Sequence, residues 1–196
     1  KKIKMSIYTR KGDKGKTQLI TGESVDKDDA RVQCYGLLDE LSSYIGWLLS
    51  SFDPDAELVL FNEKAALLYA QEVMLNAPLA FLKPTSADNG KECLYKPLLP
   101  TEADVETLEK LIDGINKEVG GLFKGFVLPG GQPLAAQGHV VRCVCRRIER
   151  QLYTLLKTND EVKKALNKAY LLPYVNRLSD FLYALAIKIN YCAKNK

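Results

Sequence analysis

Four arginines on one short segment are the residues of this sequence best suited to chemistry. The segment 139–150 reads His-Val-Val-Arg-Cys-Val-Cys-Arg-Arg-Ile-Glu-Arg. In a helix, at about 100° per residue, Arg142, Arg146 and Glu149 fall within about 60° of one another. Guanidinium groups remain charged and bind phosphate oxygens in pairs. The segment follows a Pro-Gly-Gly turn and favours a polyphosphate site, against the alternative of a solvated helix face with ordinary ion pairs. The expected buried side of the same helix is made of Val141, Val144, Ile148 and Leu152.

A glycine-rich segment near the N-terminus offers a second set of groups that could bind phosphate. Gly12 and Gly15 have only two residues between them, and no helical pattern follows, so the segment is not a Walker A loop. Its backbone N–H groups could still wrap phosphate oxygens in a nest, and an ordinary flexible tail is the alternative. The basic and hydroxyl side chains that could assist are Thr9, Lys11, Lys14, Lys16 and Thr17.

Acidic and amide side chains on two other expected helices are candidate partners for the arginines. Asp39 and Glu40 face away from the apolar stripe of the first helix, and Asn176 and Asp180 share one face of the last helix at a spacing of four. The alternative is that all of them are ordinary surface residues.

The histidine and cysteine content argues against a metal site made of protein ligands and against nucleophilic catalysis. His139 is the only histidine, and a ferritin-like di-iron site needs two Glu-x-x-His motifs. Cys143 and Cys145 lie about 200° apart on a helix and cannot reach one ion. The single histidine also disfavours Ser-His-Asp and Cys-His arrangements.

The hydrophobic pattern predicts the helices that must position these groups. Residues 6–25 read as an ordered loop with a short strand, and 83–100 read as a second loop. Steps of three and four predict helices over 28–48, 55–76, 101–119 and 134–157, and a last region from 160 with a break near Pro173. Four or five helices without alternating strands indicate an all-α, antiparallel bundle. In the second helix the apolar residues that recur are Leu58, Phe61, Ala65, Leu68 and Val73.

The composition fits one soluble domain over 1–196. The chain has 196 residues, 46% hydrophobic and 27% charged, and no charge-free apolar stretch of membrane-spanning length. A net charge of +4 is low for an obligate nucleic-acid binder, so we expect an anionic small ligand rather than nucleic acid. The five cysteines and the lack of an apolar signal core after Lys1 indicate a reducing compartment. We expect the cytoplasm, or the mitochondrial matrix if a transit peptide has been removed.

Five motifs, in order, resemble the PduO-type ATP:cob(I)alamin adenosyltransferases. They are the segments 8–17, 27–32, 35–42, 126–131 together with 145–150, and 174–180. The resemblance implies an antiparallel five-helix bundle of the ferritin-like up-and-down type that forms a homotrimer. It also implies that the 5′-deoxyadenosyl group of ATP is transferred to the cobalt of cob(I)alamin, with release of triphosphate. Because cob(I)alamin is itself a strong nucleophile, such an enzyme needs positioning and charge compensation rather than a catalytic base.

The resemblance also implies a role for each motif. Residues 1–27 would form a loop that wraps the nucleotide and its Mg²⁺ at the subunit interface, beside the corrinoid. Arg142 would pair with Asp39 of the neighbouring subunit, Arg146 would hold the outer phosphates, and Phe126 would lie against the corrin ring. Glu149 and Asn176 would orient the nucleotide. The remaining residues of the expected nucleotide-binding set are Thr9, Arg10, Lys11, Gly12, Asp13, Gly15, Thr17, Lys27 and Arg150.

Some features depart from the family pattern and leave an alternative function open. Lys11 stands where many members have Thr, Asp26 replaces a frequent Pro, and the loop 83–100 is long. The helix over 66–74 also lacks an expected Gly-containing pattern. The alternative is a noncatalytic helical bundle that binds a nucleotide or another polyanion. Corrinoid-dependent conversion of ATP to triphosphate would separate the two. In the catalytic case, the product would pass to an adenosylcobalamin-dependent mutase or dehydratase.

Overall fold

The structure, a computed structural model, is mostly helical, which confirms the predicted all-α class. It describes residues 12–20, 22–53, 60–82, 97–122, 125 and 127–195. The α-helices in this part of the chain are α1 (Ala30–Ser50), α3 (Phe61–Asn76), α4 (Glu102–Glu118), α5 (Pro133–Thr158), α6 (Asp160–Ala165) and α7 (Leu171–Lys194). A short 3₁₀ helix, η1 (Ala77–Ala80), follows α3, and the strands β1 (Lys16–Gln18) and β2 (Ser24–Asp26) form an antiparallel hairpin.

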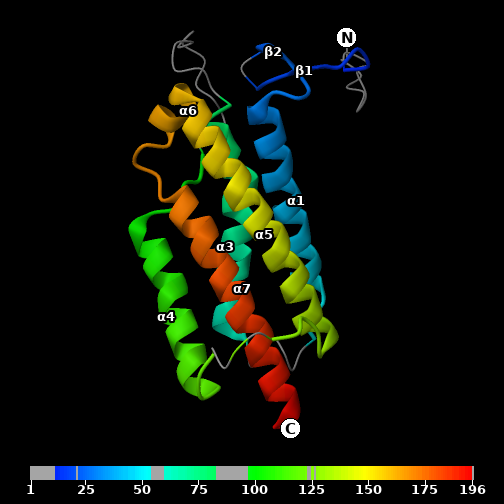
Figure 1. Ribbon diagram of the computed structural model, residues 1–196, viewed down its shortest axis with the longest axis vertical. Coiled ribbons are helices and arrows are strands. Elements are labelled where there is room, and N and C mark those ends of the chain that lie inside the picture. Colours follow the sequence, from blue (N-terminus) through cyan, green and yellow to red (C-terminus); the bar gives the residue numbers. More distant parts are fainter. Residues whose placement is uncertain are drawn as a thin grey trace, which may run out of the picture.

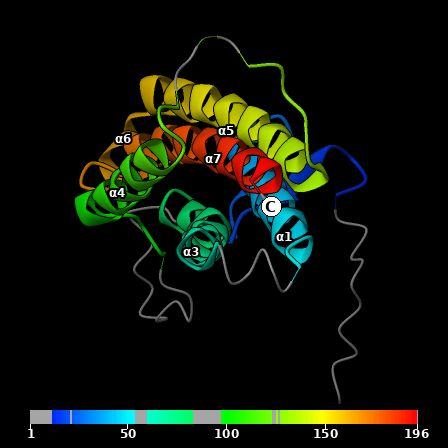
Figure 2. The same cartoon turned by 90° about the horizontal axis from the view of Figure 1, so that it is seen from below.

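The long helices lie side by side along the long axis of the molecule (Figure 1). Helix α7 packs against α5 and α4, and α1 packs against α3 and α5. Seen from the end, α7 lies in the middle of the assembly with the other long helices around it (Figure 2). The apolar residues that recur along α7 at steps of three and four, Val175, Leu178, Leu182 and Leu185, are fully buried. None of the described helices has the length and apolarity needed to cross a lipid bilayer.

Local sequence signals explain where several helices begin and end. The carboxylate of Asp29 accepts from the backbone N–H of Arg31 at 2.8 Å and caps α1. The carboxylate of Asp104 accepts from the backbone N–H of Thr101 at 2.8 Å, which forms part of a capping box at the start of α4. Helix α4 ends before Gly120, as predicted, and this glycine has a φ of +70° that favours glycine.

The break before the last helix lies earlier in the chain than the predicted position near Pro173. The break lies at 166–170, and Pro173 belongs to the first turn of α7. A proline is tolerated there because the first N–H groups of a helix have no partner within the helix. The first part of the predicted second helix, 55–59, lies outside the described residues, and the described helix α3 begins at Phe61.

Of the described apolar residues that indicate α3 in the sequence, only Val73 is buried. Phe61 is 71% exposed and Leu68 is 47% exposed, whereas Glu63 and Leu67 are buried. The Nζ of Lys188 on α7 donates to Glu63 Oε1 at 2.9 Å, so the buried carboxylate has a counter-charge. This helix has apolar residues on two faces, and the face that carries Glu63 packs inward because Lys188 compensates its charge.

Candidate active site

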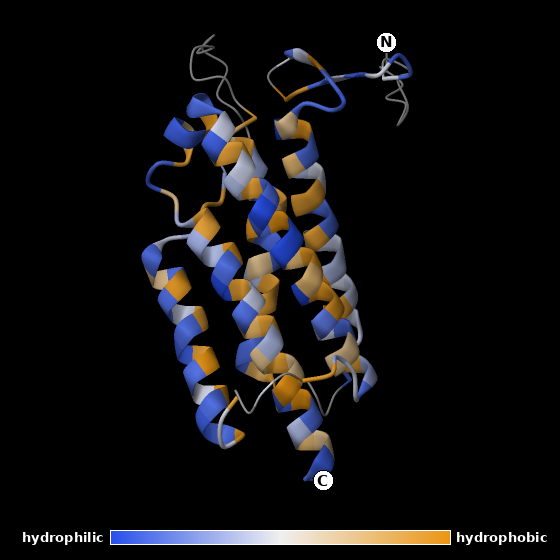
Figure 3. Cartoon of the chain, in the orientation of Figure 1, coloured by the Kyte–Doolittle hydropathy of each residue, from blue (hydrophilic) through white to orange (hydrophobic). Residues whose placement is uncertain are grey.

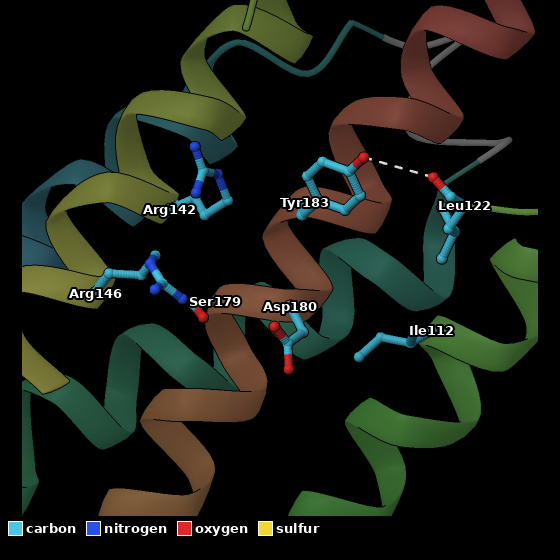
Figure 4. Close-up of a pocket in the computed structure, with 7 residues that line it drawn as sticks. All are labelled: Ile112, Leu122, Arg142, Arg146, Ser179, Asp180 and Tyr183. Carbon is cyan, nitrogen blue, oxygen red and sulfur yellow. Dashed lines mark hydrogen bonds between the residues drawn. The ribbon is translucent and has the colours of Figure 1, made fainter. Parts of the chain in front are cut away.

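Arg142 and Arg146 of α5 line a cavity between α5, α7 and α4 (Figure 4). The cavity has a volume of about 200 Å³, and we call it the arginine cavity. Figure 4 shows Arg146 reaching toward Ser179 and Arg142 lying opposite Tyr183. The hydroxyl of Tyr183 donates to the carbonyl of Leu122 at 3.5 Å. The full lining is Ile112, Leu122, Arg142, Arg146, Ser179, Asp180 and Tyr183.

The other two arginines of the segment face a separate groove between α1 and α5. This α1–α5 groove has a volume of about 630 Å³. The Nη2 of Arg147 donates to Glu40 Oε1 at 2.5 Å, which links the two helices, and no salt bridge within the described residues involves Arg150. The arginine segment therefore faces two cavities, with Arg142 and Arg146 lining one and Arg147 and Arg150 lining the other. The lining is Glu40, Tyr44, Pro129, Ala136, His139, Val140, Cys143, Val144, Arg147 and Arg150.

The helical placement of the arginine segment agrees with the predicted pattern. All four residues of the expected apolar side are buried, while Arg146, Arg147 and Arg150 are exposed. In Figure 3 the middle of α5 carries a run of hydrophilic residues on its visible face. The charge on this helix thus lies at the bundle surface, where a ligand can reach it.

Glu149 and Asn176 meet between α5 and α7. The amide Nδ2 of Asn176 donates to Glu149 Oε1 at 2.7 Å, and both side chains are half-buried. This hydrogen bond fixes the direction of the carboxylate, which leaves its second oxygen available to accept from a ligand. These two residues were expected to act together, and the fold brings them together.

Asp180 lines the arginine cavity but already has a cationic partner. Arg177 Nη1 donates to Asp180 Oδ2 at 2.8 Å, and Arg177 Nε donates to Glu109 of α4 at 3.0 Å. The carboxylate of Asp180 is therefore shared with Arg177, which reduces its negative field at Arg142 and Arg146. The cavity keeps a positive character suited to an anion.

Arg142 and Asp39 are not paired within one chain. Within the described residues, no salt bridge involves either of them, and Arg142 Nε is buried without a hydrogen-bond partner. Asp39 is exposed on α1. The Nη2 of Arg142 contacts Cys143 Sγ at 3.5 Å.

His139 is buried beside both cavities. It is 3% exposed, neither of its ring nitrogens has a hydrogen-bond partner, and its ring meets that of Tyr183 edge-on at 6.1 Å between centroids. Burial, together with the nearby charge of Arg142, lowers the pKa of His139 below its ordinary value of 6.5. The imidazole is therefore neutral near neutral pH.

The β1–β2 hairpin carries the described part of the predicted nucleotide loop. The carbonyl of Gly15, which has a φ of +80°, accepts from the backbone N–H of Lys27 at 2.9 Å. The side chain of Lys27 lies beside Gly12, close enough that a Cβ there would be 3.4 Å from its Nζ. Asp13 is exposed and Thr17 is half-buried. Thr9, Arg10 and Lys11 lie outside the described residues, as does Phe126.

Arg31 fixes the hairpin to the start of α1. Its guanidinium donates to Asp29 at 2.8 Å and to Glu23 at 3.1 Å, and it holds the pKa of Asp29 below the usual value. The hairpin projects beyond the beginning of α1 (Figure 1). This attachment presents Gly12, Gly15 and Lys27 at one end of the bundle.

Two cavity residues, Ser179 and Tyr183, did not emerge from the sequence. The signal that could have found them is their spacing of three and seven from Asn176, which places all three on one face of a helix.

The thiol of Cys145 donates to the carbonyl of Val175 at 3.2 Å, and burial raises its pKa. This thiol is not a nucleophile.

The sequence profile of the cobalamin adenosyltransferases matches residues 7–189. The chain belongs to the cobalamin adenosyltransferase family. It is 38% identical to a corrinoid adenosyltransferase of Citrobacter freundii over 92% of each chain. It is 36% identical to a corrinoid adenosyltransferase of Bacillus subtilis, over 95% of this chain and 87% of the relative.

Solved structures of the same kind share the fold. One is a variant PduO-type ATP:corrinoid adenosyltransferase from Lactobacillus reuteri complexed with cobalamin and ATP. It is 33% identical, with a TM-score of 0.77, and the match covers 96% of this chain and 93% of the other. A second variant, complexed with ATP, is 32% identical with a TM-score of 0.75. All residues that line the arginine cavity and the α1–α5 groove lie within residues 7–189, the part of this chain that the family profile matches.

Proposed function

We propose that this protein transfers the 5′-deoxyadenosyl group of ATP to the cobalt of cob(I)alamin and releases triphosphate. The observation that carries the proposal is the match to the cobalamin adenosyltransferase family over nearly the whole chain. Relatives named corrinoid adenosyltransferases, and similar structures holding ATP and cobalamin, support it. The arginine cavity supplies the charge that such a reaction requires.

The reaction exchanges one bond for another. A cobalt–carbon bond forms at C5′ of ATP with the electron pair of cob(I)alamin, the bond from C5′ to oxygen breaks, and its electron pair leaves with triphosphate. Negative charge collects on the leaving oxygen, and Arg146 is the exposed cation best placed to hold the outer phosphates. No proton has to be removed, which agrees with the neutral His139 and the paired Asp180.

Glu149 and Asn176 are proposed to orient the nucleotide. Their hydrogen bond of 2.7 Å fixes both side chains beside the arginines. The free carboxylate oxygen of Glu149 can accept from a ribose hydroxyl or an adenine amino group. Arg150, in the α1–α5 groove, adds a second cation for the nucleotide.

We further propose that the active enzyme is a homotrimer of five-helix, up-and-down bundles, in which Arg142 pairs with Asp39 of the neighbouring subunit. Asp39 is exposed, and within the described residues no salt bridge involves Arg142 or Asp39, which supports this pairing. Exposed apolar side chains on α1 and α5 support association, since Trp47 is 44% exposed and Val140 is 45% exposed. The projecting hairpin is then positioned to close over a neighbour's α5, with residues 1–27 wrapping ATP.

The magnesium ion is proposed to arrive with ATP. Within the described residues, no group of three His, Cys, Asp or Glu side chains could hold a metal ion. Mg²⁺ is commonly held by phosphate oxygens and water with one or two protein oxygens, and Asp13 or Thr17 of the loop could supply one. Its role is to offset phosphate charge.

Phe126 is proposed to lie against the corrin ring and to keep the lower cobalt face free of a ligand. The proposal rests on the resemblance of 126–131 to the family motif, because Phe126 is outside the described residues. A bulky apolar side chain there would exclude water and the nucleotide base from the cobalt. An adenosylcobalamin-dependent mutase or dehydratase would then take up the product.

Anaerobic turnover of cob(I)alamin with Mg·ATP tests the proposed function. The absorbance spectrum should change to that of adenosylcobalamin, with one triphosphate released for each corrinoid converted. Omission of the corrinoid should abolish triphosphate release. The protein is instead a noncatalytic polyanion-binding bundle if it binds ATP but releases no triphosphate at any concentration of corrinoid or of reductant.

A further inference from the structure

Asn190, near the end of α7, holds the turn that precedes α5. Its Nδ2 donates to the carbonyl of Gly130 at 2.9 Å, and its Oδ1 accepts from the backbone N–H of Gln132 at 2.8 Å. Both ends of one amide are thus used on a turn about sixty residues away in sequence. Such a paired contact fixes both the position and the orientation of the turn.

Because Gly131 has no side chain, it leaves the space that the side chain of Asn190 occupies. Its φ is +97°, and a Cβ on it would lie 2.2 Å from Asn190 Oδ1. A residue with a side chain would therefore be strained in its backbone and would also collide with the amide. The turn and Asn190 are complementary, and the pair acts as a clamp.

The clamp controls two parts of the candidate site. Pro129 lines the α1–α5 groove together with Arg147 and Arg150. Gln132 is the N-cap residue of α5, so the clamp also fixes where the arginine-bearing helix begins. A shift of the turn would move the end wall of the groove while leaving the middle of α5 held by its own core packing.

An apolar edge leads directly into the clamped turn. Val127 is 42% exposed and Leu128 is 91% exposed, and Pro129 follows. A leucine exposed to this extent on a held backbone gains nothing from the fold of one chain, and it is available for an apolar ligand face. The corrin macrocycle presents such a face, whereas the triphosphate of ATP does not.

We propose that Asn190 is a positioning residue for the corrinoid, and that its clamp on Gly130 and Gln132 holds the apolar edge of Val127, Leu128 and Pro129 in place. The inference rests on the proposed function, because it takes cob(I)alamin as the second substrate. The inference concerns the corrinoid and not ATP, since ATP is assigned to the arginines and the hairpin.

Asn190→Leu tests the clamp, because it keeps the size of the side chain and removes both hydrogen bonds. The expected result is a rise of about tenfold in KM for cob(I)alamin, with the Kd of ATP changed less than about twofold. Asn190→Asp keeps the acceptor for Gln132 but places an oxygen against the Gly130 carbonyl, so we expect an intermediate KM. Asn195→Leu is the matched control, since Asn195 bonds only its own helix at Tyr191.

Further measurements separate positioning from loss of folding. Circular dichroism and thermal unfolding report the fold, and calorimetry with Mg·ATP reports the nucleotide site. The spectrum of cob(II)alamin added to the ATP-loaded protein reports whether the lower ligand leaves cobalt, and Asn190→Leu should reduce that change. If Asn190→Leu does not fold, Asn190→Asp carries the same test, because it keeps the acceptor for Gln132 and disturbs only the contact with Gly130.

The outcomes are distinguishable. If the wild-type protein adenosylates cob(I)alamin and Asn190→Leu keeps the wild-type KM for the corrinoid, the clamp has no positioning role. An equal loss for ATP and corrinoid, together with a lower Tm, would show that Asn190 is only structural. If the wild-type protein does not adenosylate cob(I)alamin at all, the proposed function itself fails.

Discussion

Arg146→Ala is the sharpest test of the arginine cavity. Arg146 is exposed at the cavity, and within the described residues no salt bridge involves it. Its removal therefore leaves no buried partner without a counter-charge, and the free energy of unfolding should change by less than about 0.5 kcal/mol. The effect should appear almost entirely in catalysis.

The magnitude follows from the charge that Arg146 would face. Two unit charges 4 Å apart interact by about 4 kcal/mol at an effective dielectric constant of about 20. Water in the open cavity weakens this, so about 2 to 4 kcal/mol of transition-state stabilisation is the expected loss. At 1.36 kcal/mol per factor of ten, kcat/KM for ATP should fall between about 30-fold and about 900-fold.

The assay is the anaerobic conversion of cob(I)alamin at several ATP concentrations. Arg146→Lys keeps the charge but not the paired geometry, and it should fall between the wild type and Arg146→Ala. Lys157→Ala, in the last turn of the same helix, is the matched control for a lost exposed cation. Full kcat/KM for ATP in Arg146→Ala would refute the reasoning and make Arg146 an ordinary surface residue.

Three further predictions concern the interface, the core and pH. Arg142→Ala and Asp39→Ala should each weaken the proposed trimer and ATP binding, as followed by sedimentation and calorimetry; a stable, fully active monomer would contradict this. Lys188→Met should lower the free energy of unfolding by about 3 to 5 kcal/mol in urea, because Glu63 stays buried without its counter-charge, and a loss below about 1 kcal/mol would exclude that reading. Because the folded pKa of His139 is lowered, the unfolded chain binds a proton more readily, so stability should be full above pH 6.5 and should decline below it. His139→Phe should lack that part of the decline, and identical pH profiles for the two proteins would disprove it.

The buried face of a helix could be predicted from the sequence where apolar residues occupy only one face of that helix. The buried sides of α5 and α7 follow the expected spacing, as Ile148 and Leu182 show. On α3 the spacing alone is ambiguous, because apolar residues occupy two faces and the choice depends on Lys188 of α7. A pairing across 125 residues of sequence leaves no local signal. The same holds for Asn190, whose partners in the turn are about sixty residues away.

The sequence predicts the residue types of the candidate site, but it does not predict that these residues line two separate cavities. The sequence places Arg142 and Arg146 on one stripe, which the structure retains. It does not show that α5 has a neighbouring helix on each side, α7 and α1, and this is why Arg147 and Arg150 face a different groove. The pairing of Arg142 with Asp39 stays a prediction, because one chain contains only half of the proposed contact.

The two cavities and the hairpin together argue that catalysis depends on assembly. The arginines lie along the middle of α5, whereas Gly12, Gly15 and Lys27 lie on a hairpin that projects beyond α1 (Figure 1). Arg31, tied to both Asp29 and Glu23, holds that hairpin outward. In the proposed trimer, a loop held in this way would wrap a nucleotide on another subunit. Activity per subunit should then fall on dilution below the dissociation constant of the trimer, and a specific activity independent of dilution across dissociation, followed by sedimentation, would show that one chain completes its own site.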